Sequence, residues 1–408
     1  MHRLSKQSES GAVSLFIVIF SALLITIITV AFIRIMIQQQ EQATTNDLSK
    51  SALDSSYAGV EDAKRAIIRY QTLDCAGAGA PTTDCVHLTD AFNSQECNTL
   101  QQTGLVSAKP EDKEVQVQQN PNDSQLEQAY TCVKVQLNTK DYLGDINSDA
   151  SRLIHLKSTG AFNQVTVEWY SQQDLTSNVA SASSGKVDLY SGLPPLPLPK
   201  LNEWPQNRPA LLRLQLLQFG KTFNLSDFNK NDGLNRDDAS LFLYPANYGD
   251  TTASFSDDTR MNSNSSTLRP VNCDPTFSTT GGKGAYACTM TISIPNPVGT
   301  SDNNNRDAYL RVDELYNTST NFRVTLQNVN GGAVSTADFN AVQPAVDSTG
   351  RANDLFRRVK SRIDLEGSSI PSLEAAVDIT GSLCKTFLVT DNASDYNPGT
   401  CQDQTSSP

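Results

Sequence analysis

The first 70 residues carry a hydrophobic pattern that differs from that of the rest of the chain. Residues 12–33 form a run of 22 positions without a charged side chain, directly after a short leader that contains Arg3 and Lys6. A helix rises about 1.5 Å per residue, so this run is long enough to cross a hydrocarbon core of roughly 30 Å. A secretory signal has an apolar core of about 7 to 15 residues followed by a small-residue cleavage site. The apolar run here is longer, and no such cleavage site follows it. Basic residues tend to stay on the cytoplasmic side, which predicts a single-pass protein of the cytoplasmic membrane with its N-terminus inside and its C-terminus outside.

The helical pattern continues beyond the apolar run. No proline occurs before Pro81, which predicts one helix over residues 12–70, about 59 residues and about 90 Å long. Its outer half carries a stripe of mostly small residues, among them Ala52, Ser56, Gly59 and Ala63, which would let a sheet approach the helix backbone closely. The alternative is a coiled-coil stalk, but the branched side chains that such a stalk needs at heptad positions are missing.

Beyond residue 70 the pattern becomes one of short alternating segments rich in β-branched and aromatic residues. We expect strands at residues 130–137, 151–158, 164–170, 211–219, 240–244, 286–294, 322–327, 357–365 and 375–389. The alternation of leucine and proline from Leu193 to Pro199 favours an extended segment and predicts a boundary there. The expected fold class is α+β, a long N-terminal helix that carries a large, mostly antiparallel β head.

These observations predict five regions along the chain. They are a leader at residues 1–11, a transmembrane and assembly helix at 12–70, a cysteine-rich α+β part at 71–192, a Pro-rich linker at 193–205 and a β-rich part at 206–408.

Eight cysteines lie beyond the apolar run, where the predicted topology places them in an oxidising compartment. An even number and the absence of a C-x-x-C pair favour disulfide bonds over a zinc or redox centre. Two pairs would close short loops, Cys273 with Cys288 and Cys384 with Cys401. The remaining four would then pair among themselves: Cys75, Cys85, Cys97 and Cys132.

Charge and motif content narrow the function classes. Lys and Arg total 32 against 44 Asp and Glu, a net charge of −12, so nonspecific nucleic-acid binding is not expected. The chain has only three histidines, one of them in the leader, and neither a G-x-S-x-G nor an H-E-x-x-H motif. We therefore expect a protein that is not an enzyme.

One segment places oxygen-bearing side chains at alternating positions, as a calcium-binding loop does. Its candidate ligands are Asp227, Asn229, Asn231 and Asp238. The loop glycine falls one place late and the twelfth residue is Asp rather than the longer Glu, so an Asn/Asp-rich turn is the alternative. Calcium is the one cofactor that the sequence suggests.

The leader and the helix combine features that occur together in one family. The leader ends in Gly11, the apolar segment begins at Ala12, and the helix continues through SALDSSYAGVEDA at residues 51–63. In these features the chain resembles type IV pilin-like proteins, and more narrowly the PilX-type minor pilins. The resemblance covers about the first 70 residues. It implies a type IV pilin-like fold, a cut after Gly11 by a prepilin peptidase and methylation of the new N-terminus at Ala12.

The chain departs from the family at one position. Most major pilins have a glutamate five residues after the cut, thought to pair with the N-terminal amine of the neighbouring subunit, and here that position is Phe16. In an apolar bundle a carboxylate and an amine are stable only when they are paired. A subunit without the glutamate therefore provides no carboxylate for the N-terminal amine of the subunit ahead of it. The resemblance then implies a place at the filament tip, although an anchor that keeps its leader has no use for the glutamate either.

The sequence thus predicts a minor, tip-located subunit of a type IV pilus-like filament that initiates assembly or adheres to a surface. The assembly helix would act through Phe16, Ile19, Leu23, Ile27 and Ile33. Its partners would be other pilin subunits, the cytoplasmic membrane before assembly, the prepilin peptidase and a host or neighbouring cell surface, and its final location the extracellular filament. The alternative is an uncleaved, membrane-anchored binding module or adhesin outside any filament.

Overall fold

The computed structural model describes residues 10–75, 82–94, 96–97, 99–106, 114–117, 128–147, 151–178, 186–192, 199–219, 238–255, 268–277, 285–299, 307–316 and 319–365. The chain forms two compact units. The N-terminal unit comprises residues 1–135 and 346–361, and the sandwich unit comprises residues 136–345 and 362–408. The chain passes between the units within three strands, since the boundaries at residues 135/136, 345/346 and 361/362 all lie inside strands.

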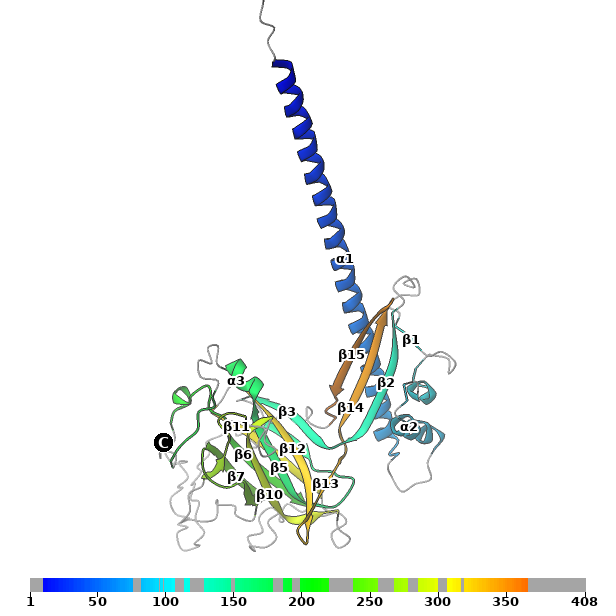
Figure 1. The fold of residues 1–408 in the computed structure, drawn as a ribbon. Helices are drawn as coiled ribbons and strands as arrows, with labels where there is room; N and C mark the ends of the chain where they lie inside the picture. Colours follow the sequence, from blue (N-terminus) through cyan, green and yellow to red (C-terminus); the bar gives the residue numbers. More distant parts are fainter. Residues whose placement is uncertain are drawn as a thin grey trace, which may run out of the picture. The chain divides into compact units, whose positions relative to one another are not determined.

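The N-terminal unit is built on one long helix, α1, which runs from Ser10 to Thr72 and contains 63 residues (Figure 1). The predicted helix over 12–70 is thereby confirmed, with two further residues at each end. A second helix, α2 (Thr83–Asn93), begins after Thr82, whose side chain accepts a hydrogen bond from the Cys85 backbone nitrogen at 3.3 Å. A short 3-10 turn, η1 (Thr99–Thr103), follows α2.

Four strands form the sheet of this unit, in the order β1-β2-β14-β15. Their bounds are β1 (Val115–Gln116), β2 (Ala129–Thr139), β14 (Phe339–Ala352) and β15 (Leu355–Arg362). Disulfides join Cys75 to Cys85 and Cys97 to Cys132, so the first four cysteines pair among themselves as predicted.

The sandwich unit contains two sheets. One has the order β13-β12-β5-β10-β8, with β3 also paired to β12, and the other has the order β4-β11-β6-β7-β9. Most pairs are antiparallel, but β10 with β8 and β7 with β9 are parallel. The strands of the first sheet are β3 (Asp141–Asn147), β5 (Phe162–Ser171), β8 (Thr252–Ser254), β10 (Tyr286–Val298), β12 (Ser319–Asn330) and β13 (Ala333–Ala337). Those of the second are β4 (Ser151–His155), β6 (Leu211–Phe219), β7 (Asp238–Ala246), β9 (Leu268–Asn272) and β11 (Asp307–Leu315).

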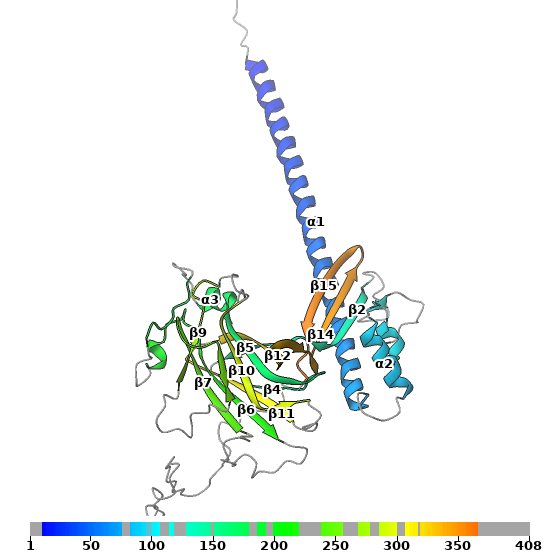
Figure 2. The same ribbon diagram turned by 60° about the horizontal axis from the view of Figure 1, so that its bottom comes forward.

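The two sheets share one apolar core, and Figures 1 and 2 show them as separate layers. Strand β6 explains why this sequence folds so: its residues alternate between buried and half-buried positions, which places Leu212, Leu214 and Leu216 on the core face. From the facing sheet, β5 contributes Val167 and Trp169. The predicted bond between Cys273 and Cys288 is present in this unit. A short helix, α3 (Gln172–Asn178), follows β5, and a 3-10 turn, η3 (Leu201–Glu203), precedes β6.

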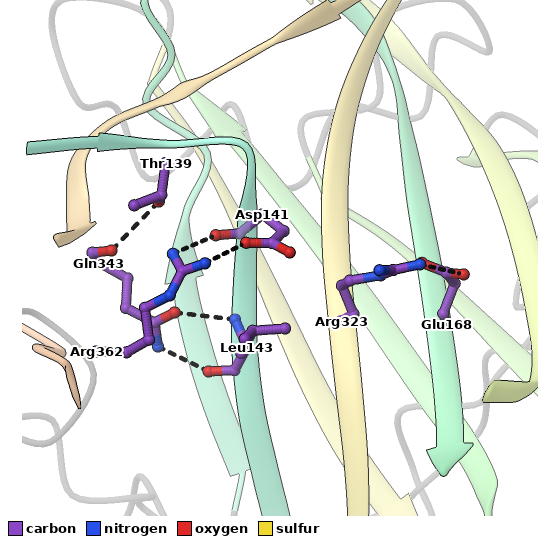
Figure 3. Close-up of polar contacts among 7 residues, drawn as sticks. All are labelled: Thr139, Asp141, Leu143, Glu168, Arg323, Gln343 and Arg362. Atoms are coloured by element: carbon purple, nitrogen blue, oxygen red, sulfur yellow. Dashed lines mark hydrogen bonds and ion pairs between the residues drawn. The ribbon is translucent and has the colours of Figure 1, made fainter. Parts of the chain in front are cut away.

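Near the start of β3, polar side chains rather than a neighbouring strand bind backbone groups of this strand (Figure 3). The Gln343 amide accepts a hydrogen bond from the Leu143 backbone nitrogen at 2.9 Å and donates one to the Leu143 carbonyl at 2.7 Å. Arg362 donates to the Asp141 carboxylate at 2.6 Å, and Arg323 of β12 binds Glu168 of β5 through two nitrogens. Because buried polar groups must be satisfied, these contacts fix the positions of the strands that carry them.

Eight of the nine predicted strands correspond to observed strands, and the ninth, at residues 375–389, lies outside the described residues. The segment 193–198 also lies outside them, as do Cys384 and Cys401. The compact units divide the chain at positions other than the predicted linker at 193–205. Strand β5 precedes that linker, yet it pairs with β10 and β12, which follow it. The fold is thus a long apolar N-terminal helix joined to a large β region with antiparallel and mixed sheets and disulfide bonds, compatible with the α+β class.

Candidate functional site

The candidate functional site is the N-terminal half of α1, where every residue from 14 to 47 is exposed. The predicted assembly residues all lie here, with exposed fractions between 51 and 71 %: Phe16, Ile19, Leu23, Ile27 and Ile33. Residues on the other sides of the helix are equally bare, such as Phe20 at 74 % and Ile25 at 62 %. The helix is therefore apolar around its whole circumference, as helices are that lie in a membrane or inside a bundle.

This half of α1 is long and apolar enough to span a membrane. None of its most apolar window is covered by the rest of the chain, so it is not a core helix of the protein's own fold. Three of its hydroxyl groups are satisfied within the helix, because Ser21, Thr26 and Thr29 each donate a hydrogen bond to a backbone carbonyl three or four residues earlier. Such bonds are required where no water is available.

The apolar half of α1 carries no charged residue between positions 14 and 33. Phe16 is exposed, and the first charged residue after it in the chain is Arg34. The described part of this apolar segment therefore offers no carboxylate that could pair with an amine in an apolar environment. Gly11 and Ala12, the predicted processing residues, lie in the first turn of α1, and their side-chain environment is outside the description.

A polar stretch at residues 38–47 separates the apolar half from the part of α1 that is packed. It is helical and exposed on all sides. Thr44 and Thr45 each donate a hydrogen bond to a backbone carbonyl four residues earlier. This stretch sets the apolar half apart from the sheet by about 15 Å of helix.

The outer half of α1 is held by close contact with the sheet. Buried residues there are Ala52, Ser55, Ser56, Gly59, Val60, Ala63, Ala66 and Ile67, most of them small as predicted. A Cβ atom on Gly350 of β14 would collide with the Ala52 carbonyl oxygen and the Ser56 backbone nitrogen, and would lie 2.8 Å from the Ser55 carbonyl carbon. A Cβ atom on Gly59 would lie 2.8 Å from Val133 of β2. The strands thus approach the helix backbone directly, which fixes the outer half of α1 in its unit.

The predicted calcium ligands cannot be placed. Asp227, Asn229 and Asn231 lie outside the described residues, and Asp238 is the first residue of β7, with its side chain outside the description. Among the described residues no group of three or more His, Cys, Asp or Glu side chains could hold a metal ion.

Sequence reasoning missed Gly350 and Glu314. Gly350 interrupts a strand pattern, a signal that indicates close backbone approach. Glu314 lies in an alternating segment where the sequence gives no sign that it faces the core.

Comparison of the chain with family models, with curated proteins and with solved structures found no match. The described residues define a class of protein: a chain with one N-terminal helix that is long and apolar enough to span a membrane, joined to a β-rich region with disulfide bonds.

Proposed function

We propose that this protein is a minor subunit of a type IV pilus-like filament, located at or near the filament end, with a structural rather than an enzymatic role. The observation that carries the proposal is the division of α1 into a bare apolar half and an outer half packed on a sheet. A helix that is apolar on all sides needs an apolar environment on all sides. The membrane supplies it before assembly, and sister helices supply it in the filament.

The absence of charge between residues 14 and 33 supports movement between these two environments. Lipid tails and apolar side chains are about equally favourable surroundings for such a helix, so leaving the membrane for a helical bundle costs little. A charged residue in the same segment would favour the aqueous boundary instead. The outer half of α1 packs against the sheet at Gly350, so the sheet moves together with the helix.

An end position is supported by Phe16 and by the size of the region beyond α1. A subunit with Phe16 cannot neutralise the N-terminal amine of a subunit ahead of it, and at the tip no such subunit exists. The region from residue 73 to residue 408 is bulky for a repeat that packs side by side in a shaft. At the end this region is free to initiate assembly or to contact a surface.

We infer the processing steps from the resemblance of the first 70 residues to type IV pilin-like proteins. A prepilin peptidase would cut after Gly11, and Ala12 would become the methylated N-terminus. The disulfide bonds fit a head on the oxidising side of the membrane. The protein would pass from the cytoplasmic membrane into an extracellular filament through contacts with other pilin subunits.

A second candidate function is an uncleaved, membrane-anchored binding module. It is favoured by Phe16 and by the start of α1 at Ser10, before the proposed cut. An anchor that stays in the membrane needs neither a free amine nor a carboxylate partner.

Mass spectrometry of the N-terminus separates the two candidates. We expect protein purified from cells that assemble such filaments to lack residues 1–11 and to carry one added methyl group on Ala12. Gly11→Leu should retain the leader, whereas the adjacent control Ser10→Ala should be processed like the wild type. An intact Met1 in the wild type would contradict the proposal and support the anchored module.

A further inference from the structure

One edge of the first sandwich sheet is open along β13. Strand β13 (Ala333–Ala337) is the last strand on its side of this sheet, and a turn at Gly331 and Gly332 joins it to β12. Both glycines have positive φ angles, of 58° and 87°, as in a two-residue hairpin turn. Every residue from 330 to 336 is exposed, and Val334 is 63 % exposed. Strand β13 therefore presents an edge that no other described strand covers.

The register of the hairpin shows which backbone groups face this edge. In an antiparallel pair, bonded and non-bonded residue pairs alternate, and the pair next to a two-residue turn is bonded. Val334, which lies opposite Val329, is then in a non-bonded pair and directs its N–H and C=O away from β12. Val329 agrees with this, because its own N–H and C=O bind the Asn163 side chain at 2.9 and 2.8 Å. By the same alternation, Thr336 also directs its N–H and C=O to the open edge.

The same edge is closed on both sides of these two residues. Strand β3 lies on the same side of β12 as β13, since both strands pair with β12 opposite β5. On β3, the Gln343 side chain binds the N–H and C=O of Leu143. Directly after β13, the Asp338 carbonyl accepts a backbone hydrogen bond at 2.9 Å. Between these two stretches, the N–H and C=O groups of Val334 and Thr336 have no hydrogen-bond partner among the described residues.

Strand β13 also lacks the features that usually protect an edge strand from pairing with another chain. Its sequence, AVSTA, contains neither a charged residue nor a proline. The whole chain has a net charge of −12, which opposes the approach of two copies through their charged surfaces. Strand β13 brings no charge of either sign to such an encounter. An uncharged edge with free backbone groups is therefore the place at which two copies can meet.

We propose that β13 is a self-association site, at which β13 of a second copy of this chain adds antiparallel to the open edge. Val334 of one copy lies opposite Thr336 of the other, and a two-fold axis passes beside Ser335. This register gives both open residues a partner in the other copy and forms four backbone hydrogen bonds. A register shifted by two residues would pair only one of them with an open residue. The contact is small and therefore weak, and it does not depend on the filament role.

Disulfide cross-linking of the full chain in detergent micelles tests this pairing. In the proposed register Ser335 faces its counterpart in a non-bonded pair, with Cα atoms about 4.5 Å apart, which a disulfide bond can span. The two copies of Val334 are diagonal neighbours about 7 to 8 Å apart, beyond the usual span of a disulfide bond. Under mild oxidation, Ser335→Cys should therefore give several times more cross-linked dimer than Val334→Cys. The wild type gives the background from the native cysteines.

Two further variants, made in the Ser335→Cys chain, test the backbone bonds. Val334→Pro removes the outward N–H, whereas the matched control Val334→Ala loses the same side chain and keeps this N–H. Because the Val334 N–H does not bind β12, the proline variant should fold. The cross-linked dimer should be lost in Val334→Pro and kept in Val334→Ala.

The comparison of the two cysteine variants does not depend on how the proline variant folds. The proposal is overturned if Ser335→Cys cross-links no more than Val334→Cys, or if Val334→Pro and Val334→Ala cross-link equally. Oxidation of intact cells before purification adds one more test. Capture of a different polypeptide by Ser335→Cys, in place of a second copy, would also overturn the proposal.

Discussion

At the residue scale, Tyr130 connects the sheet of the N-terminal unit to α1. Its hydroxyl donates a hydrogen bond to Asp62 Oδ2 at 2.8 Å, and the residue is 4 % exposed. The Asp62 carboxylate also forms an ion pair with Arg65 at 3.0 Å. It therefore keeps a partner in a variant that lacks the Tyr130 hydroxyl. Burial first, and the Asp62 hydrogen bond and charge next, raise the pKa of the Tyr130 phenol well above its ordinary value.

This shift predicts a loss of stability at alkaline pH. The folded-state pKa lies above the unfolded value of about 10, so the contribution of neutral Tyr130 is complete below pH 10 and is lost as the pH rises further. The loss is about 1.4 kcal/mol per pH unit above 10 while the folded phenol stays neutral. Tyr130→Phe should therefore lose less stability than the wild type between pH 10 and 11, measured by thermal unfolding in far-ultraviolet circular dichroism.

Tyr57→Phe is the control, because Tyr57 lies on α1 but is 51 % exposed. Its alkaline profile should match that of the wild type. Parallel profiles for Tyr130→Phe and the wild type would show that the phenol does not titrate in this way.

At the element scale, the contact between β14 and α1 depends on a position without a side chain. Gly350→Ala would place a methyl group against the backbone atoms of residues 52–56, which cannot rotate away. We expect it to destabilise the N-terminal unit by about 2 to 3 kcal/mol. Denaturant unfolding followed by circular dichroism measures this cost.

Gly160→Ala is the matched control, since a Cβ atom at Gly160 meets nothing within 4 Å. It should be neutral or slightly stabilising, because alanine restricts the unfolded chain. Equal stability of the two alanine variants would refute the proposed helix–strand contact.

Local patterns explain which elements could be predicted. The range 211–219 was predicted with its observed bounds, because β6 alternates regularly. Strand β14 was missed because Pro344 and Gly350 interrupt its pattern, and both are tolerated for tertiary reasons. Gly350 faces the helix backbone, and the Pro344 carbonyl accepts a bond from the Ile363 nitrogen. Strand β3 was missed for a similar reason, because Gly144 interrupts its pattern. This glycine is also kept for a tertiary reason, since a Cβ atom on it would lie 2.6 Å from Phe322.

The apolar half of α1 and the buried Glu314 differ in the same way: one could be predicted from a local pattern and the other could not. The apolar half of α1 could be predicted because its signal is a continuous run of side chains. The burial of Glu314 could not be predicted, because it depends on the pairing of β11 with β4 and β6, which are distant in sequence. A charged residue in an alternating segment indicates an exposed face until the register of the strand is known.

At the scale of the whole molecule, the units depend on long-range strand pairing. Strand β5 lies between β10 and β12, each more than 100 residues later in the chain. A Pro-rich segment is a local signal and carries no information about such pairing. The Cys273–Cys288 disulfide was easier to predict, because it closes a loop with a sequence separation of only 15 residues, whereas the pairing within the first four cysteines was left open.

The filament claim concerns the whole molecule and depends on α1 leaving the membrane. Ile27→Glu would place a charge in the middle of the bare apolar half, at a cost of about 2.5 to 3.5 kcal/mol in a membrane. Gln39→Glu adds the same charge in the exposed polar stretch and is the matched control.

The most direct test is to shear filaments from cells that make this protein and to quantify the chain in the filament fraction. The account predicts that the wild type and Gln39→Glu occur there in a form that lacks residues 1–11, and that Ile27→Glu is absent. Recovery of the wild type only as a full-length protein in the membrane fraction would contradict the account.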